Sequence, residues 1–444
     1  MPPSDLPAPF ADPLLPQLPL PSPFTTPKHL RLRAFVRSYV DTHLAPHAQE
    51  WETAGLVPPS VYQTHCSHGF SIVHPITKPE YAGGVTLPAG IPYDEWDVYC
   101  SVIVGDEFSR LGWCGVTWSL GGGNGIGCPP IARFGTEEQK KRWLPGVAQG
   151  KIRFCLGITE PEGGSDVANI QTTAERRRNE KGEEVYVLNG AKKWITNGLW
   201  ADYCTTAVRT GGKSHGGISL LVVPLNAKGV RRTRIENQGV HASGSTLITY
   251  DDVEVPVSNL LGRENQGFAL IMSNFNPERL SLATAALRLS RVCVADAYAY
   301  ACDRHTFGKP LIEHSAIKSK FAEMGTLIEP AQAFLEQLLA ILDYAAKNPG
   351  VGEVNVGGMT ALLKVMTTRC LEKVCREAQQ IMGGAGYSKS GRGARIEQIS
   401  RDVRVHVVGG GSEEIMSDLA VRQEVRDVVL RAKARERVSN ESKL

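Results

Sequence analysis

The spacing of apolar residues changes twice along the chain, and this change constrains the fold more than any other feature. From Leu30 to Thr53, and again from Glu137 to Val147, apolar side chains recur every three or four residues, as on one face of a helix. Between about Phe154 and Leu261 this pattern gives way to short β-rich runs. Helical spacing returns at Phe268 and continues to about Arg437. The sequence therefore predicts helices, then a compact antiparallel β domain, then a helical bundle.

The predicted architecture is an α+β multidomain protein. Its expected parts are a proline-rich flexible arm (1–28), an N-terminal helical domain (29–152), a middle β domain (153–265), a C-terminal helical bundle (266–437) and a tail (438–444). Within the β domain, Asn189-Gly190 separates Val185–Leu188 from Ala191–Thr196 and is typical of a two-residue hairpin turn. We therefore expect the chain to reverse at this dipeptide.

Charge and cysteine content exclude several classes of protein. The 444 residues include 49 basic and 46 acidic side chains, a net charge of +3 that indicates no nucleic-acid-binding surface. No apolar run approaches the roughly 20 residues of a membrane span. The ten cysteines form no CxxC pair, which suits buried free thiols in a reducing compartment. His65-Cys66-Ser67-His68 lacks convergent partners, so no metal site is expected.

Both ends of the chain carry information about its location. The first 28 residues contain ten prolines and no arginine, which disfavours an amphipathic mitochondrial presequence. The last three residues are Ser442-Lys443-Leu444, the C-terminal tripeptide that peroxisomal import receptors recognise. We therefore expect a peroxisomal protein.

Two segments of the β domain together predict a flavin pocket. Thr159-Glu160-Pro161-Glu162-Gly163-Gly164-Ser165-Asp166 offers small residues, a hydroxyl and backbone N–H groups for close approach of a ligand. Trp194-Ile195-Thr196-Asn197-Gly198 adds a flat indole and a second hydroxyl. On a strand, Trp194 and Thr196 would point to the same side, the ring stacking and the hydroxyl hydrogen-bonding. The alternative is an ordinary loop beside an ordinary half-buried strand.

Motifs outside the β domain extend this pattern over roughly residues 30 to 430. They are Phe134 to Trp143 (FGTEEQKKRW), Arg304 to Lys309 (RHTFGK), Gln380 to Tyr387 (QIMGGAGY) and Arg401-Asp402. With these motifs in this order, the sequence resembles the acyl-CoA dehydrogenase family of flavoproteins. The resemblance implies an FAD cofactor shared across the interface of a homo-oligomer, a tetramer or a dimer.

The resemblance also implies particular contacts. FAD contacts are implied for Ile158, Thr159, Trp194, Thr196, Arg304, Phe307, Gln380, Gly383, Gly384, Ser412 and Glu414. Of these, Arg304, Phe307, Gln380, Gly383 and Gly384 would reach the FAD of a neighbouring subunit. Substrate contacts are implied for Ser165, Arg279, Gly410 and Gly411. Independently of the family, a permanently charged guanidinium such as that of Arg304 suits a pyrophosphate. A surface ion pair is the alternative for Arg304.

The catalytic base departs from the best-known family pattern. Many relatives carry a glutamate nine residues after the first residue of the Arg-Asp pair, but here that count from Arg401 reaches Gly410, which cannot accept a proton. A second branch, which includes isovaleryl- and long-chain-type enzymes, carries the base in a Glu-Arg-Leu context, found here as Glu278-Arg279-Leu280. We predict Glu278 as the base, with Glu413 or Glu414 in reserve. The alternative for Glu278 is an ordinary carboxylate in the first turn of a helix that starts near Pro277.

The resemblance, with these residues, implies an FAD-dependent dehydrogenase of an acyl-CoA thioester. The base would remove the α-proton while the β-hydrogen leaves as hydride to flavin N5. Such a base must reach Cα opposite the flavin, and burial must raise its pKa toward neutrality. The electron acceptor stays open between an electron-transfer flavoprotein and oxygen. Alternatives are an oxidase of acyl-CoA or another carbon acid, and a flavin-bearing binding protein without turnover. The acyl chain length is not predicted.

Overall fold

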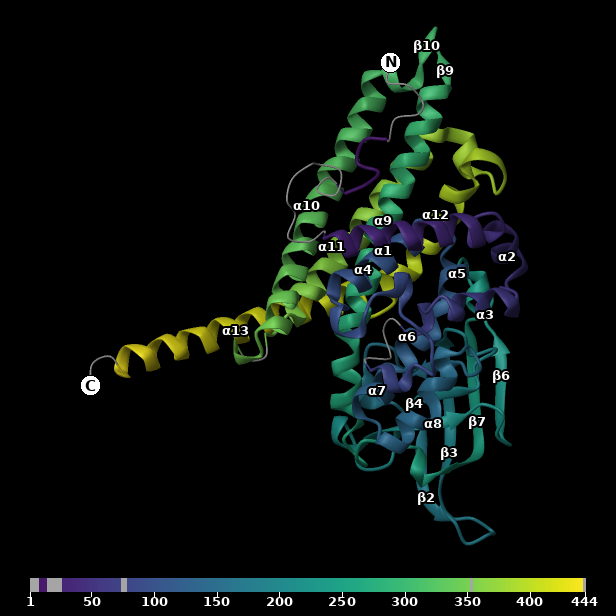
Figure 1. Ribbon diagram of the computed structural model, residues 1–444, viewed down its shortest axis with the longest axis vertical. Coiled ribbons are helices and arrows are strands. Elements are labelled where there is room, and N and C mark those ends of the chain that lie inside the picture. Colours follow the sequence, from purple (N-terminus) through teal and green to yellow (C-terminus); the bar gives the residue numbers. More distant parts are fainter. Residues whose placement is uncertain (1–7, 14–25, 73–77, 352–353, 442–444) are drawn as a thin grey trace. The chain divides into compact units, whose positions relative to one another are not determined.

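The computed structural model describes residues 8–13, 26–72, 78–351 and 354–441 (Figure 1). Within these residues the chain forms two compact units, which are described separately. One unit comprises Pro27–Phe275, and the other comprises the chain from Asn276 together with the described part of the N-terminal arm. Most of the proline-rich arm and the tripeptide Ser442-Lys443-Leu444 lie outside the described residues.

The first unit begins with short helices, of which the first five pack around a buried aromatic and aliphatic core and the last two pack against the sheet. The helices are α1 (Pro27–Tyr39), α2 (Ala48–Ala54), α3 (Pro59–Ser67), α4 (Val98–Ser109), α5 (Cys114–Thr117), α6 (Gly123–Gly127), α7 (Pro129–Phe134) and α8 (Glu137–Ala148). A π-helical turn at Val40–Leu44 interrupts the helix predicted for Leu30 to Thr53. Helix α8 begins as its sequence indicates, because Thr136 and Gln139 form a reciprocal capping box.

One eight-stranded sheet follows. Its strands are β1 (Phe154–Gly157), β2 (Thr173–Arg178), β3 (Glu184–Ile195), β4 (Tyr203–Arg209), β5 (Ile218–Pro224), β6 (Val230–Arg234), β7 (Thr246–Pro256) and β8 (Leu260–Leu261). They lie in the order β6-β7-β3-β2-β4-β5-β8, and β1 pairs in parallel with β4. Figure 1 labels β2, β3, β4, β6 and β7 of this sheet. Strand β5 is buried at every position before Pro224, which agrees with its apolar sequence from Leu220 to Val223.

The hairpin predicted at Asn189-Gly190 is wrong, because β3 runs straight through these residues. The backbone of β3 passes close to Thr172 here, so that a Cβ on Gly190 would lie 2.6 Å from the Thr172 Oγ1 atom. The Asn189 side chain exchanges two hydrogen bonds of 2.9 Å with Asp252 on the neighbouring strand β7. The dipeptide therefore marks an irregularity between paired strands. The chain instead reverses between β2 and β3, where the Asn179 side chain accepts two backbone hydrogen bonds.

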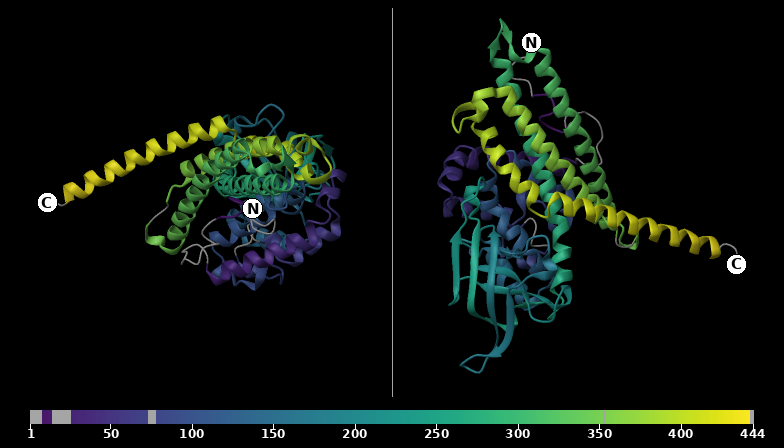
Figure 2. Two further views of the ribbon diagram at one scale, coloured as in Figure 1. Left: turned by 90° about the horizontal axis from the view of Figure 1, so that it is seen from above. Right: turned by 180° about the vertical axis from the view of Figure 1, so that it is seen from behind.

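The second unit is a bundle of long helices (Figure 2). Its helices are α9 (Gly267–Asp303, within this unit from Asn276), α10 (Ser315–Lys347), α11 (Gly357–Met382), α12 (Ala394–Val408) and α13 (Glu413–Glu441). A small hairpin of β9 (His305–Thr306) and β10 (Lys309–Pro310) joins α9 to α10. Helix α11 packs against α10, α12 and α13. Within the part of the chain that the structure describes, no helix combines the length and apolar character needed to cross a membrane.

Residues 8–13 of the arm are bound to this bundle. The Arg288 guanidinium donates to Asp12 Oδ1 at 2.7 Å, and Arg291 donates to the Phe10 carbonyl at 2.8 Å. Both arginine side chains are 1% exposed. Buried guanidinium groups require such acceptors. The prediction of a flexible arm therefore does not hold for residues 8–13.

Candidate active site

The two segments predicted to form a flavin pocket meet in the first unit. The backbone N–H of Lys193 donates to the Thr159 carbonyl at 2.8 Å. The Lys192 ammonium, which is completely buried, donates to the Ile158 carbonyl at 3.0 Å and to Glu160 Oε1 at 2.7 Å. The backbone around Ile158 and Thr159 is therefore held from the neighbouring strand β3 by both main-chain and side-chain contacts.

The buried pair of Glu160 and Lys192 fixes the start of the first segment. Glu160 also accepts hydrogen bonds from the backbone N–H groups of Gln171 and Thr172. Burial raises the pKa of Glu160, but the Lys192 ammonium and these hydrogen bonds more than offset this, so the pKa lies below its usual value. Burial lowers the pKa of Lys192 to about 8, against the attraction of Glu160. At neutral pH both partners are therefore charged.

The prediction that Trp194 and Thr196 point to the same side of a strand is wrong. Trp194 lies near the end of β3, and Thr196 follows the strand. The pairing of β3 with β7 shifts register between Lys192 and Ile195, and Trp194 has a positive φ of 65°. Strand β3 ends at Ile195, so Thr196 follows it in a turn and the i, i+2 relation of a regular strand does not apply. The Trp194 indole is 52% exposed, which leaves it available for a ligand.

Asn197 holds this turn in place and was not assigned a role from the sequence. Its side chain accepts from the Gly123 N–H at 2.8 Å and donates to the carbonyls of Ser243 and Trp118 at 2.9 and 3.1 Å. It thereby joins the end of β3 to the helical region. Asn197 has a φ of 62°. The sequence signal for this turn is the asparagine itself, since asparagine tolerates the left-handed region better than most residues.

In the second unit, Glu278 lies inside a long helix. Helix α9 begins at Gly267 and contains Pro277, so the alternative of a first-turn carboxylate is wrong. The Glu278 Oε2 atom is buried and has no hydrogen-bond partner among the residues that the structure describes. Burial raises the pKa of Glu278 to about 7, against attraction from Arg279 and Lys364. A buried carboxylate with a pKa near neutrality has the properties expected of a general base.

Gly410 lies directly beside this carboxylate. It has a φ of 67°, in the turn that follows α12. A Cβ on Gly410 would lie 3.9 Å from Glu278 Oε1 and 2.7 Å from Leu282 Cδ1. The two positions at which the resemblance implies a base, 278 and 410, therefore lie side by side within this unit, and Leu282 occupies the space that a side chain at position 410 would need.

Two cations hold the turn that contains Gly410. Arg279 Nε donates to the Gly410 carbonyl at 3.1 Å, and Lys364 Nζ donates to the Gly411 carbonyl at 2.8 Å. Arg279 also donates to Asn276 Oδ1 at 3.1 Å. Arg279, predicted to contact substrate, thus contacts the main chain beside Glu278. The role of Lys364 was missed, because a single lysine in a helical pattern carries no signal of burial.

The reserve candidates for the base are less suitable. Glu413 forms an ion pair with Arg369, and this hydrogen-bonded contact lowers the pKa of Glu413. A carboxylate engaged with a guanidinium is a weak base. Glu414 is exposed at the first turn of α13, and Ser412 is half-buried just before it.

The remaining predicted FAD contacts of the second unit lie on its surface. Phe307 is 97% exposed at the tip of the β9–β10 hairpin, with a φ of 51°. Arg304 is exposed and forms no ion pair with any described residue, contrary to the surface-pair alternative. Gln380, Gly383 and Gly384 are also exposed, and a Cβ on either glycine would meet open space. Ser165, in the other unit, is exposed as well.

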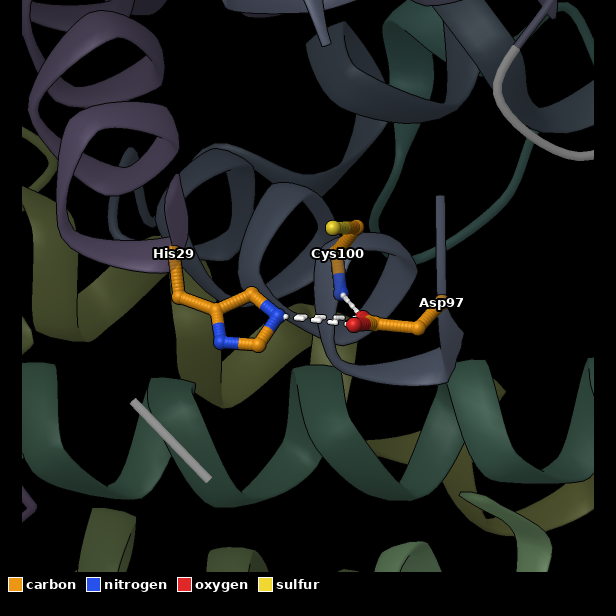
Figure 3. Close-up of side chains that lie close together, drawn as sticks. All are labelled: His29, Asp97 and Cys100. Atoms are coloured by element: carbon orange, nitrogen blue, oxygen red, sulfur yellow. Dashed lines mark hydrogen bonds and ion pairs between the residues drawn. The ribbon is translucent and has the colours of Figure 1, made fainter. Parts of the chain in front are cut away.

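A possible metal-binding group lies elsewhere in the first unit. His29, Asp97 and Cys100 lie close together between α1 and α4 (Figure 3). Asp97 accepts from His29 Nε2 at 3.0 Å and from the Cys100 backbone N–H at 2.9 Å, and it forms an ion pair with Lys28. Burial raises the pKa of Asp97, but these hydrogen bonds hold it well below its usual value. Because Asp97 caps α4 and joins it to α1, this group has a structural role.

Three family models together match most of the chain. They describe the acyl-CoA dehydrogenase N-terminal domain (residues 26–151), middle domain (155–253) and C-terminal domain (265–424). Acyl-CoA dehydrogenase AFT10-1 of Alternaria alternata is 46% identical, over 90% of this chain and 92% of that protein. Acyl-CoA dehydrogenase apdG of Emericella nidulans is 40% identical, over 94% and 95%. A probable acyl-CoA dehydrogenase structure from Mycobacterium abscessus is 34% identical, with a TM-score of 0.80 over 90% of this chain and 99% of that chain.

Proposed function

Because the chain belongs to the acyl-CoA dehydrogenase family, we propose that it oxidises an acyl-CoA thioester to the α,β-unsaturated thioester with Glu278 as the base. The observation that carries this proposal is the half-buried Glu278 side chain beside Gly410: its Oε2 atom is buried, and desolvation raises the pKa of the carboxyl to about 7. Because position 410 is glycine, we assign the protein to the branch of the family whose members carry the base in a Glu-Arg-Leu context.

The residues present fit an FAD cofactor. The first unit offers the exposed Trp194 indole beside the turn at Thr196. The second offers the exposed Arg304 guanidinium and the open backbone at Gly383-Gly384. The indole suits stacking on a planar ring, and the guanidinium suits a pyrophosphate. The two glycines allow a ligand to approach the backbone closely. When bound, FAD supplies an acceptor for the substrate's β-hydrogen as hydride.

The contribution of Glu278 is proton transfer. The α-hydrogen of a thioester is weakly acidic, so its removal needs a base that is strong enough and still ionised at the working pH. A pKa of about 7 meets both conditions at neutral pH. Since the carboxylate is the active form, activity is expected to rise as the pH increases through this value.

The direct test mixes the purified flavoprotein anaerobically with a panel of acyl-CoA esters of different chain length and branching. Bleaching of the flavin absorbance by at least one ester, with formation of the enoyl-CoA product, is expected. If no ester bleaches the flavin, the protein is a flavin-bearing binding protein and the proposal fails.

The same experiment distinguishes the electron acceptors. From the tripeptide Ser442-Lys443-Leu444 we propose a peroxisomal location. A peroxisomal address separates it from a mitochondrial electron-transfer flavoprotein, which favours oxygen. Air admitted to the bleached protein is then expected to restore the oxidised spectrum quickly and to yield peroxide. Slow reoxidation would argue for a protein acceptor.

We further propose that Arg304 and Phe307 contact FAD held by a second copy of the chain in a homo-oligomer. Their exposure on one chain supports this role. Arg304→Ala is expected to lower the affinity for FAD at least tenfold, because a charged hydrogen bond to the pyrophosphate is lost. FAD titration of apoprotein measures this effect, and Arg304→Lys should restore part of it. Arg404→Ala, which removes another exposed guanidinium, serves as control. Equal affinity of Arg304→Ala and wild type would contradict the assignment.

A further inference from the structure

Lys364 is a buried cation surrounded largely by main-chain oxygen atoms. It lies on α11 with no residual exposure. Its ammonium donates to the Val407 carbonyl in the last turn of α12 and to the Gly411 carbonyl at 2.8 Å. Carbonyl groups at a helix C-terminus favour a cation, both as acceptors and through the helix dipole. Lys364 thereby joins three elements, namely α11, the end of α12 and the turn before α13.

The charged and titratable groups that face Lys364 come from three helices. They are Glu278 and Arg279 on α9, His406 on α12, and Glu413 and Glu414 at the start of α13. Burial lowers the pKa of Lys364 to about 8, so its ammonium form prevails at neutral pH. Among these carboxylates, Glu413 is paired with Arg369, whereas one oxygen of Glu278 lacks a hydrogen-bond partner among the described residues. The charge of Lys364 therefore adds to that of Arg279 in favouring the ionised form of Glu278.

The same lysine also holds the turn Gly409-Gly410-Gly411, which lies beside that carboxylate. Gly410 is the residue whose added Cβ would approach Glu278 Oε1 to 3.9 Å. Its carbonyl is held by Arg279 and the next carbonyl, that of Gly411, by Lys364. Both Gly410 and Gly411 have positive φ angles, 67° and 109°, so the turn adopts a conformation that few other residues allow.

We infer that Lys364 is a positioning residue for Glu278: its ammonium holds the Gly409-Gly410-Gly411 turn against the base, and its charge favours the carboxylate form of Glu278. This inference rests on the proposed function, because it assigns Lys364 a role only through the base. A lysine with a purely structural role would hold the turn without affecting the ionisation of Glu278. The two roles therefore differ in their effect on the pH dependence of the reaction.

The test is the pH profile of substrate-dependent flavin reduction by Lys364→Met holoenzyme. Loss of a nearby positive charge typically shifts a carboxylate by one pH unit or more. The acidic limb of the profile is therefore expected to move up by about one pH unit. At pH values below the limb, the variant is then about tenfold slower than wild type, whereas on the alkaline plateau the two rates differ little. Lys373→Met is the matched control, since Lys373 lies on the same helix but has an exposed side chain, which pairs with Glu323 and Glu377. Its profile is expected to match wild type.

An unshifted acidic limb in Lys364→Met, with only a lower melting temperature, would overturn the inference. If this variant yields no holoenzyme, Lys364→Gln replaces it, because a neutral amide can still donate to the Gly411 carbonyl. The same upward shift is expected there, and its absence counts against the inference in the same way. Glu278→Gln distinguishes failure of the proposed function from failure of the role of Lys364. If Glu278→Gln keeps the wild-type rate, the proposed function fails; if it is inactive while the Lys364 variants keep the wild-type profile, only the role of Lys364 fails.

Discussion

Glu278→Gln is expected to lower the rate of substrate-dependent flavin reduction by about 10²–10⁴-fold, the usual contribution of a general base. Glutamine preserves the shape of the side chain but cannot accept the α-proton at neutral pH. The effect should appear in stopped-flow bleaching with the best ester of the acyl-CoA panel. Because one oxygen of Glu278 is buried without a hydrogen-bond partner among the described residues, the neutral amide should not destabilise the fold through loss of a contact there.

Glu413→Gln is the matched control for this variant. It removes the reserve carboxylate at the start of α13, which is held by Arg369. It is expected to retain flavin reduction within a fewfold of wild type. FAD content and the melting temperature of both variants must match wild type for the comparison to hold. A wild-type rate in Glu278→Gln combined with a large loss in Glu413→Gln would move the base to Glu413 and refute our assignment.

Glu160→Gln is expected to destabilise the first unit by about 3–5 kcal/mol, because it leaves the Lys192 ammonium buried without its counter-charge. The new amide group would also face the backbone N–H of Thr172, a donor that now bonds to Glu160. Urea denaturation followed by tryptophan fluorescence measures the loss. FAD affinity should fall as well, since this pair holds the backbone around Ile158 and Thr159.

The control for the buried pair is an exposed pair in the same domain. Glu175 and Arg177 lie on β2 with side chains that are 65% and 59% exposed, so Glu175→Gln should leave stability unchanged. The pH dependence supplies a second check. Because the folded-state pKa of Glu160 lies below its unfolded value, its contribution is fully present above the unfolded pKa and is lost as the pH falls through the folded one. Equal stability of Glu160→Gln and wild type would show that Lys192 finds another partner.

The order of helical and β regions was predictable because it depends on local periodicity. Helix α8 follows its capping box and apolar spacing, and β5 follows the apolar run Leu220 to Val223. The prediction of a helical domain, a β domain and a helical bundle is confirmed. Predictions from dipeptides were less secure. Asn189-Gly190 forms no hairpin because its neighbours on β7 and at Thr172 engage it within a strand, and these contacts are distant in sequence.

The sequence by itself determined which residues were candidates for chemistry: the paired segments around Thr159 and Trp194, the glycine at position 410 and the glutamate at position 278. Only the tertiary structure decided their environments. It placed Gly410 beside Glu278, although 132 positions (410 − 278) separate them, and it buried Lys192 and Lys364 where each meets main-chain carbonyls. The physical reason is that residue identity and periodicity are local properties, whereas the pKa of a buried group depends on desolvation and on charges that distant parts of the chain bring to it.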